Sequence, residues 1–453
     1  MRCRCRTSWR GSATDDTSWE SLGLLVARQE IFLLQRILWL TSTLVPAMAR
    51  RVRAPSAMAG PWIACLLDEV RQKVACELCV VAPFPGACRE DFVEDGVRYV
   101  ILPRRRRWHY WNYSWEGLDD AAAIIDEFKP ALIHVHGTEH CLGLAHRRAK
   151  HHCGSVVSLQ GILGAIQWRT LGELDLWDVF RSERLIDLVR MSGVIGTRRT
   201  WRLGAKVEAD VFQAHSHFLG RTAWDRCQLH ARNPEAVYHH VGEPLRNEFY
   251  AERWSLASIV RHTLFFGNLA GAHKGCHTIL RALPIIARDF PGVRVRIAGR
   301  ANSKSGYGRM FINEARQLGV GDRVDFLGFL DAAAMARELA AAHVFVSASH
   351  VDNSPNSVGE AQVVGVPVVG SYVGGVPEML QDARAGLLFP AGDAETLADR
   401  VCQVFRDDSL TQSLSAAGRV VALARHDRAV ILRQLVDAYA AAGCDVRGQD
   451  RDE

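Results

Sequence analysis

The chain has 453 residues, more than one hydrophobic core ordinarily organises, so its length predicts two domains. Its 48% hydrophobic and 23% charged residues are typical of a globular protein and exclude the fibrous and disordered classes. The net charge of +5 is too small to require a nucleic acid partner, and no apolar run reaches the roughly 20 residues of a membrane-spanning helix.

The chain begins with a basic stretch, which has four Arg in its first ten residues and no apolar segment after them as a signal peptide would have. We expect residues 1–34 to be a weakly ordered extension, with a peripheral amphipathic helix as the alternative. A second basic run, Arg104 to Arg107, predicts a solvated loop. The alternative is contact with an anionic membrane or an acceptor phosphate.

Twelve cysteines are scattered without a disulfide framework. Cys76 and Cys79 form a CxxC with no second pair to complete a zinc site, and we place them at a helix-to-strand transition as buried thiols. Reduced thiols fit a cytoplasmic location. We therefore expect a cytoplasmic protein, with peripheral contact at the inner face of the membrane as the alternative.

The first part of the chain alternates short apolar strands with helices, which predicts a parallel sheet covered on both faces. The expected helices are residues 62–73 and 119–128. The expected strands are residues 36–45, 77–85, 97–103, 131–137, 154–161 and 209–216. An irregular stretch, 232–254, follows.

The alternation then starts afresh, and a helix from residue 394 has Asp393 placed as its N-cap. The expected strands are residues 262–268, 293–300, 323–329, 343–349 and 366–372, with helices 276–290 and 332–342 between them. The sequence thus predicts two doubly wound α/β units joined near residues 243–257. Ligands bind outside the carboxyl ends of such strands, so two facing units imply a central cleft.

The most informative stretch, "HVDNSPNSVGEAQVV", follows the strand 343–349. We expect a helix to begin near Pro355 or Asn356, where free backbone N–H groups attract an anion or hydroxyl oxygens. Asp352 in the loop and Glu360 about one turn into the helix can then face the same cleft. A carboxylate offers two acceptor oxygens that match a vicinal diol, so this segment is predicted to hold a sugar and a ribose.

These residues carry a family resemblance. From about Arg36 to Ala441 the chain resembles a retaining glycosyltransferase of family 4 (glycosyl transferases group 1), which has the GT-B fold. The family signature is E-x7-E followed by Ala, a G-x-P-V strand and a Gly-Gly-x-x-E turn. The matching segments here are Asp352 to Ala361, Gly365 to Val368 and Gly374 to Glu378, with Asp in place of the first Glu.

By this resemblance Glu360 binds the ribose of the donor nucleotide. The first acid and the loop after it contact the donor sugar; this set is Asp352, Asn353, Ser354, Pro355, Asn356 and Ser357.

A second signature is a strand ending in Gly-Arg, followed after a short loop by Lys-Gly. Here it reads Gly267-Asn268 and Lys274-Gly275. The resemblance implies that this segment grips the donor diphosphate, with Lys274 as a catalytic cation at the start of a helix. Asn268 stands where the family has Arg, and a neutral amide cannot neutralise phosphate charge.

Three histidines, His134, His136 and His140, end an N-terminal strand in the pattern H-x-H-x3-H. We expect His134 and His136 to point to opposite faces of the strand, which would keep them from sharing a metal. The resemblance implies that His136 lines the cleft as a catalytic residue; a structural histidine is the alternative. Gly60, before a helix, is a loose match to the family's glycine-rich loop, and residues 160–166 are a second expected cleft loop.

The function implied is transfer of a sugar from a nucleotide-diphosphate sugar to an acceptor hydroxyl with retention, in polysaccharide or glycoconjugate biosynthesis. The expected partners are that donor and a glycan or lipid-linked acceptor, without nucleic acid, metal or cofactor. The alternatives are a weakly active nucleotide-sugar-binding partner protein and a nucleotide-sugar epimerase on the same fold.

The expected organisation has four parts. They are an extension (1–34), an acceptor-side domain (35–245), a nucleotide-sugar-binding domain (246–420), and a C-terminal helix that packs back on the first domain, with a tail (421–453).

Overall fold

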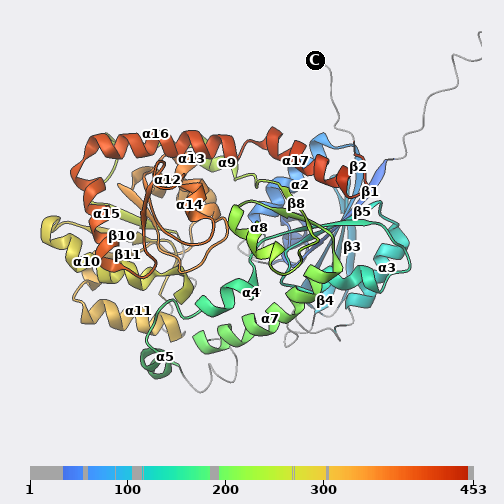
Figure 1. Cartoon of the computed structure of the whole chain (residues 1–453), viewed down its shortest axis with the longest axis horizontal. Helices are drawn as coiled ribbons and strands as arrows, with labels where there is room; N and C mark the ends of the chain where they lie inside the picture. The colour runs from blue at the N-terminus through green and yellow to red at the C-terminus, as the bar shows by residue number, and fades with distance from the viewer. Residues whose placement is uncertain are drawn as a thin grey trace, which may run out of the picture. The chain divides into compact units, whose positions relative to one another are not determined.

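The computed structural model describes residues 34–54, 60–86, 88–104, 115, 117–183, 193–267, 269, 271–301 and 306–446. Within the compact unit Gln35–Glu453 lie an eight-stranded and a six-stranded sheet, both flanked by helices (Figure 1). The predicted alternation of strands and helices thus builds two Rossmann-like halves. The extension before Leu34, the basic run after Arg104, and Asn268 lie outside the described residues.

The first sheet has the strand order β3-β4-β2-β1-β5-β6-β7-β8, in which only the β3–β4 pair is antiparallel. Its strands are β1 (Gln35–Thr41), β2 (Cys76–Pro85), β3 (Glu90–Glu94), β4 (Val97–Arg104), β5 (Leu132–His136), β6 (Gly154–Ser158), β7 (His217–Gly220) and β8 (Val237–His240). The helices in this part of the chain are α1 (Pro46–Arg51), α2 (Pro61–Lys73), α3 (Gly117–Phe128), η2 (Cys141–Arg147), α4 (Leu163–Ile166), η3 (Gln167–Arg169), α5 (Leu176–Ser182), α7 (Val194–Ala214) and α8 (Ala223–His230). Of these, α5 packs against α11 (Gly306–Gln317) of the other half.

Alternate residues of the central strand β1 serve two cores. Ile37 and Trp39 belong to a cluster on one face of the sheet, while Leu38 and Leu40 belong to another on the opposite face. Successive side chains of a strand point to opposite faces, so a strand that is covered twice is apolar throughout. This is why the near-continuous apolar run predicted a buried strand.

The second sheet is wholly parallel, with the order β11-β10-β9-β12-β13-β14. Its strands are β9 (Thr263–Phe266), β10 (Arg294–Ile297), β11 (Val324–Phe326), β12 (Val344–Ser347), β13 (Val368–Ser371) and β14 (Leu387–Phe389). Its helical segments are α9 (Asn247–Ala251), η4 (Ala272–Lys274), α10 (Cys276–Asp289), α11 (Gly306–Gln317), η5 (Gly321–Arg323), α12 (Ala332–Ala341), α13 (Asn356–Val364), α14 (Val376–Met379) and α15 (Ala394–Arg406). The predicted N-cap of α15 is confirmed, since the Asp393 side chain accepts a hydrogen bond from the amide of Thr396.

Three predicted local features are wrong. Residues 209–216, expected as a strand, belong mostly to α7, because Val207, Val211 and Phe212 recur at helical spacing and are buried; the strand of this region, β7, starts only at His217. Cys76 and Cys79 do not straddle a helix and a strand, since both lie within β2. The stretch 232–254, expected to be irregular, contains β8 and α9.

The chain ends with two long helices, α16 (Asp408–Arg425) and α17 (Arg428–Ala441), of which the second returns to the first sheet (Figure 1). Leu435 and Tyr439 are buried in the same core cluster as Trp39. The Trp39 indole donates a hydrogen bond to the Tyr439 hydroxyl at 3.2 Å, and this hydroxyl also contacts His134 Nδ1 at 2.7 Å. Helix α17 therefore packs into the core of the first half, although the rest of the second half precedes it in the chain.

We expect Leu435→Ala to lower the free energy of unfolding by about 2–5 kcal/mol, because it leaves a cavity where a side chain with no exposed surface was packed. Leu423→Ala is the matched control: Leu423 is 39% exposed on α16, so its loss should cost less than about 0.5 kcal/mol. Chemical denaturation of both variants measures the difference. Equal destabilisation by the two would contradict the packing of α17 against the first sheet.

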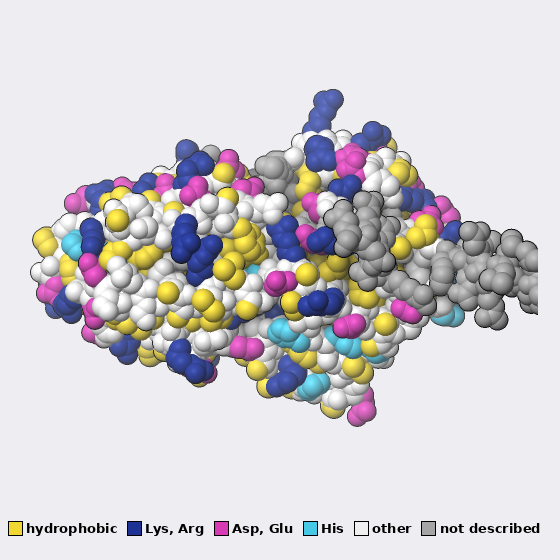
Figure 2. Space-filling model, turned by 90° about the horizontal axis from the view of Figure 1, so that it is seen from above, with side chains coloured by type: hydrophobic (Ala, Val, Ile, Leu, Met, Phe, Trp, Pro, Cys, Tyr) yellow, Lys and Arg dark blue, Asp and Glu magenta, His cyan; other side chains and the backbone are white. Residues whose placement is uncertain are grey.

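Charges of both signs cover the surface. Figure 2 shows Lys and Arg side chains interspersed with Asp and Glu on the viewed face, with apolar side chains between them. Among the helices within the described ranges, none is long and apolar enough to cross a membrane.

Candidate functional site

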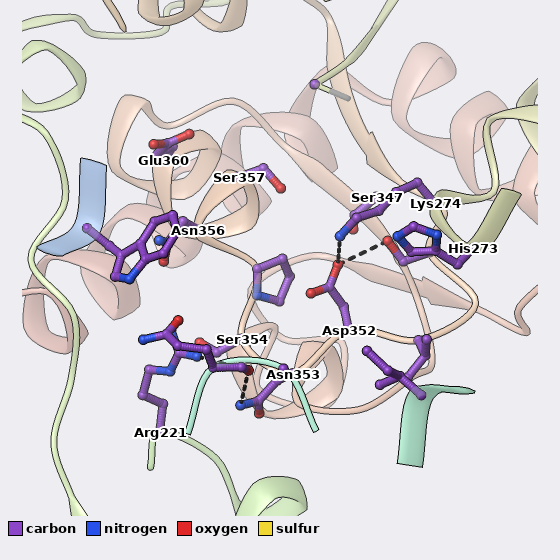
Figure 3. Close-up of a pocket in the computed structure, with 18 of the residues that line it drawn as sticks. Arg221, His273, Lys274, Ser347, Asp352, Asn353, Ser354, Asn356, Ser357 and Glu360 are labelled. Atoms are coloured by element: carbon purple, nitrogen blue, oxygen red, sulfur yellow. Dashed lines mark hydrogen bonds and ion pairs between the residues drawn. The ribbon is translucent and has the colours of Figure 1, made fainter. Parts of the chain in front are cut away.

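A cavity of about 550 Å³ lies between the two halves, and both contribute to its walls. From the first half come Glu139, Gln160 and Arg221, which follow β5, β6 and β7. From the second half come the segments that follow β9 and β12 (Figure 3). Parallel strands place their carboxyl ends at one edge of the sheet, so residues that follow different strands converge on one cavity.

The segment after β12 supplies most of one wall. Helix α13 begins at Asn356 as predicted, with Pro355 in the N-cap position and no side chain capping the helix. Its first backbone N–H groups are therefore available to an anion or a hydroxyl oxygen. The predicted donor-binding residues that line the cavity are Gly267, Lys274, Asp352, Asn353, Ser354, Pro355, Asn356, Ser357 and Glu360.

Lys274 and Asp352 form an ion pair inside the cavity. Their Nζ and Oδ2 atoms are 2.7 Å apart, and the Ser349 hydroxyl donates a further hydrogen bond to the same oxygen at 3.1 Å (Figure 3). The two side chains are 26% and 16% exposed, so the charges are shielded from bulk water yet open to a ligand. The sequence predicted both residues but not their contact.

Gly275 does not line the cavity, although it was predicted to bind donor. It has a φ of +71°, and a Cβ at this position would collide with the carbonyl oxygen of Ala348. Only glycine allows the turn between η4 and α10 to pack this closely against the segment after β12. Gly275 thus serves by placing Lys274 at the cavity.

Glu360 has a partner that sequence reasoning missed. Arg246, in the link between the halves, lines the cavity and places a guanidinium nitrogen 2.7 Å from Glu360 Oε1. Burial raises the pKa of Glu360 above its usual value, although Arg246 acts in the opposite direction. Arg246 lies in the stretch expected to be irregular, where no periodicity marked it.

Asn353 connects the two halves through its side chain. Its carboxamide oxygen accepts a hydrogen bond from the Thr222 hydroxyl at 2.9 Å, and its nitrogen donates to Asp225 at 3.0 Å and to the Gln160 carbonyl at 3.2 Å. The side chain is therefore engaged by the first half. Contact of Asn353 with a donor sugar, as predicted, would have to come from its main chain.

Glu378, in the Gly-Gly-x-x-E turn, also reaches the first half. Its carboxylate accepts a hydrogen bond from the backbone amide of Ala223, at the start of α8, at 2.7 Å. Together with the Asn353 contacts, this bond fixes the carboxyl end of β7 against the second half.

The first half holds its wall of the cavity with buried carboxylates. The Glu243 carboxylate forms an ion pair with Arg221 at 2.5 Å and accepts a hydrogen bond from the side-chain amide of Gln160 at 2.7 Å. The Glu208 carboxylate, on α7, accepts hydrogen bonds from the first two backbone amides of α4 at 2.9 and 2.6 Å. It therefore caps α4 from a remote position in the sequence. These contacts fix the loop 160–166, several of whose residues line the cavity as predicted.

The prediction for His134 and His136 is wrong in its geometry. Residues two apart on a strand share a face, and the two rings stack with centroids 3.8 Å apart. His136 does not line the large cavity but a small adjoining one, which shares Trp62, Gln160 and Arg221 with it. Burial lowers the pKa of His136 to about 3, which keeps the ring neutral near pH 7. In the described part of the chain, no group of three or more His, Cys, Asp or Glu side chains is arranged to hold a metal ion.

Sequence reasoning also missed Arg221 and Glu139. The sequence does contain a signal for Arg221, because Gly220 ends β7 and Arg221 follows it, much as Gly267 follows β9. The strand itself was misplaced by several residues, so the signal was lost. Glu139 lies three residues after His136, and only the turn at Gly137 brings it to the cavity.

Comparison with known proteins agrees with this architecture. Residues 260–407 match the protein family described as glycosyl transferases group 1. The phosphatidyl-myo-inositol mannosyltransferase of Mycobacterium leprae is 31% identical over 233 residues, covering 50% of this chain and 60% of the relative. The glycogen synthase of Mycobacterium tuberculosis is 29% identical over 203 residues, covering 44% of this chain and 48% of the relative. The chain thus spans about half of these relatives' lengths.

Solved structures resemble the whole fold. Sucrose-phosphate synthase of Thermosynechococcus elongatus superposes with a TM-score of 0.64 at 15% identity, covering 90% of this chain and 100% of that one. HepE of Anabaena, in complex with UDP and glucose, gives a TM-score of 0.63 at 16% identity with the same coverage. The chain therefore has the GT-B fold, and its residues 260–407 match the group 1 family of glycosyl transferases.

Proposed function

We propose that the protein is a retaining glycosyltransferase that moves a sugar from a nucleotide-diphosphate sugar to a hydroxyl of a glycan or lipid-linked acceptor. The observation that carries the proposal is the convergence in one cavity of the Lys274–Asp352 pair, the uncapped start of α13, and Glu360. These groups match the diphosphate, the sugar and the ribose of such a donor. The activities for which the two similar proteins are named, mannosyl transfer and glycogen synthesis, support the same reaction class.

The chemistry requires stabilisation of a leaving group. The bond between the sugar carbon and the diphosphate oxygen breaks with both electrons remaining on that oxygen, through an oxocarbenium-like transition state. Lys274 and the start of α10, which follows Gly275, would stabilise this negative charge. The acceptor oxygen attacks on the face that the diphosphate leaves, and its proton passes to the leaving phosphate oxygen. No protein base is needed in this scheme, which agrees with the neutral, recessed His136.

A screen of UDP-, GDP- and ADP-sugars tests the donor class. A donor present at 100 times its dissociation constant should stabilise the fold by about 2.7 kcal/mol, which a thermal-shift measurement detects. Transfer then requires an acceptor, and NMR of the product reports whether the anomeric configuration is retained. Conversion of the donor sugar to its epimer without acceptor would favour the epimerase alternative. Absence of any shift with all three nucleotide classes would contradict the proposal.

We expect activity to survive EDTA. Lys274 supplies a positive charge in the cavity, and no cluster of metal ligands occurs among the residues described there. The measurement compares initial rates in excess EDTA with rates in added magnesium or manganese. Complete loss in EDTA with recovery on adding either ion would show that a metal neutralises the diphosphate.

Location and membrane contact stay predictions. Of the basic run for which contact with an anionic membrane was the alternative, only Arg104 lies within the described residues. The N-terminal extension, for which a peripheral helix was the alternative, lies outside them up to residue 33. We infer a cytoplasmic protein because the expected donor is a nucleotide sugar. Vesicle sedimentation with and without anionic lipid would detect peripheral binding.

A further inference from the structure

One carboxyl oxygen in the cavity wall has no partner. Glu139 lines the cavity from the first half, and its Oε2 atom is buried without a hydrogen-bond partner in the described part of the chain. Buried polar atoms are nearly always paired, because an acceptor that is buried without a partner lowers the stability of the fold. The scheme proposed above does not use this carboxyl, although Glu139 lines the cavity, so the carboxyl is free to bind a second ligand there.

The backbone holds this carboxyl in place. Gly137 directly follows β5 and has a φ of +99°, and a Cβ there would lie 2.7 Å from Glu139 Oε2. The intervening Thr138 is fixed by a hydrogen bond from its hydroxyl to Glu208 at 2.8 Å. Glycine therefore permits the carboxyl to fold back over the end of the strand. The Glu139 carboxyl is therefore positioned by the backbone at Gly137 and by the hydrogen bond of Thr138.

A second unpartnered atom on the same wall is a donor. Trp62, the second residue of α2, lines the cavity, and its indole Nε1 is buried without an acceptor among the residues described. Trp201, on α7, lines the cavity as well. A hydroxyl group both donates and accepts, so a ligand with several hydroxyls can satisfy Glu139 and Trp62. Indole rings also offer apolar faces to the C–H surface of a sugar ring.

We propose that Glu139 accepts a hydrogen bond from a hydroxyl of the acceptor, and that the part of the acceptor entering the cavity is a saccharide. This inference rests on the proposed function, because it assigns the acceptor side of the same cavity. Glu139 is thus an acceptor-binding residue, distinct from the groups that hold the donor. It also explains why the first half leaves both a buried acceptor and a buried donor unpaired.

The electrostatic surroundings of Glu139 predict that saccharide binding depends on pH. Burial is the largest influence on Glu139 and raises its pKa to about 7, with help from the nearby Glu208. The amides of Glu139 and Thr138 and the Arg221 guanidinium act in the opposite direction. The ionised form is the better acceptor, so saccharide binding should strengthen as pH rises from about 6 to about 8. The same dependence should be absent when residue 139 does not titrate.

Saturation-transfer NMR with methyl α-D-mannopyranoside and methyl α-D-glucopyranoside tests this directly. We expect at least one probe to give a signal with the wild-type protein that is roughly fivefold weaker with Glu139→Gln. In the wild type the signal should grow with pH across that range, and in the variant it should stay flat. Cyclohexanemethanol, a ring with one hydroxyl, should give little signal with either protein. Glu395→Gln, an exposed change on α15, is the matched control and should behave as the wild type.

Binding of UDP, GDP and ADP is measured in the same samples. Loss of the saccharide signal with nucleotide binding intact supports the role of Glu139, and an unchanged melting temperature shows that the variant is folded. Equal saccharide signals for wild type and Glu139→Gln, or no signal with either saccharide probe, would overturn the inference. Failure of all three nucleotides to bind would instead contradict the donor assignment, while the saccharide comparison still decides the role of Glu139. If Glu139→Gln does not fold, Glu139→Asp replaces it, with the same loss expected because the shorter side chain withdraws the carboxyl.

Discussion

Lys274→Ala is expected to lower turnover by roughly two to three orders of magnitude, since removing one preorganised charge donor from a transition state costs about this much. The structure strengthens the expectation, because Lys274 is the cation that faces Asp352 across 2.7 Å in the cavity. Its removal takes away the charge offered to the diphosphate and also leaves the Asp352 carboxylate to repel that diphosphate. Turnover and donor Michaelis constant are measured with saturating acceptor.

Two variants control this result. Lys150→Ala removes an exposed lysine that does not line the cavity and should leave turnover unchanged. Lys274→Arg keeps the charge and should retain more activity than Lys274→Ala. If Lys274→Ala stays within threefold of the wild type while its melting temperature is unchanged, Lys274 does not bind the diphosphate.

Asp352→Asn is expected to lower turnover by about two orders of magnitude, whereas Glu360→Gln should mainly raise the donor Michaelis constant. Asp352 would lie beside the transferred sugar, where charge develops in the transition state. Glu360 would hold the ribose, which does not react, so its contribution is binding shared by ground and transition states. The ion pair of Glu360 with Arg246, on the link between the halves, places it on a different part of the wall from Lys274.

Binding of the free nucleotide diphosphate, which lacks the sugar, separates the two acids. Glu360→Gln should weaken this binding. Asp352→Asn should not weaken it, because losing the carboxylate leaves Lys274 free for phosphate. The opposite pattern would mean that the two roles are exchanged. Asp399→Asn, an exposed change on α15, serves as the matched control.

Asp352→Glu, which restores the residue typical of the resembled family, is expected to lose activity. The carboxylate of Asp352 already reaches Lys274 at 2.7 Å and accepts from Ser349 at 3.1 Å. An additional C–C bond, about 1.5 Å, would push the carboxylate into the cation or past it. A gain of activity would show that the ion pair is not the working arrangement.

The sequence by itself determined the features that depend on local chemistry. Alternation of apolar strands with amphipathic helices predicted both sheets, because burial on two faces makes a strand continuously apolar. The start of α13 was readable from Pro355 and the small polar residues around it, and the start of α15 from its N-cap Asp393, because where a helix starts depends largely on neighbours in the chain. Lys274 and the two acids were found for the same reason. Their spacing relative to strand ends is a local property.

The tertiary structure alone decided which groups meet. Lys274 and Asp352 are 78 residues apart in the sequence, and Arg246 and Glu360 are 114 apart. Asn353 reaches Thr222 across 131 residues, which turns a predicted sugar ligand into a link between the halves. No periodicity encodes such pairings, because they follow from strand order and from how the two sheets face each other. The recessed position of His136 and the unpaired carboxyl of Glu139 arise in the same way. They depend on the side chains that other strands and helices bring to the end of β5.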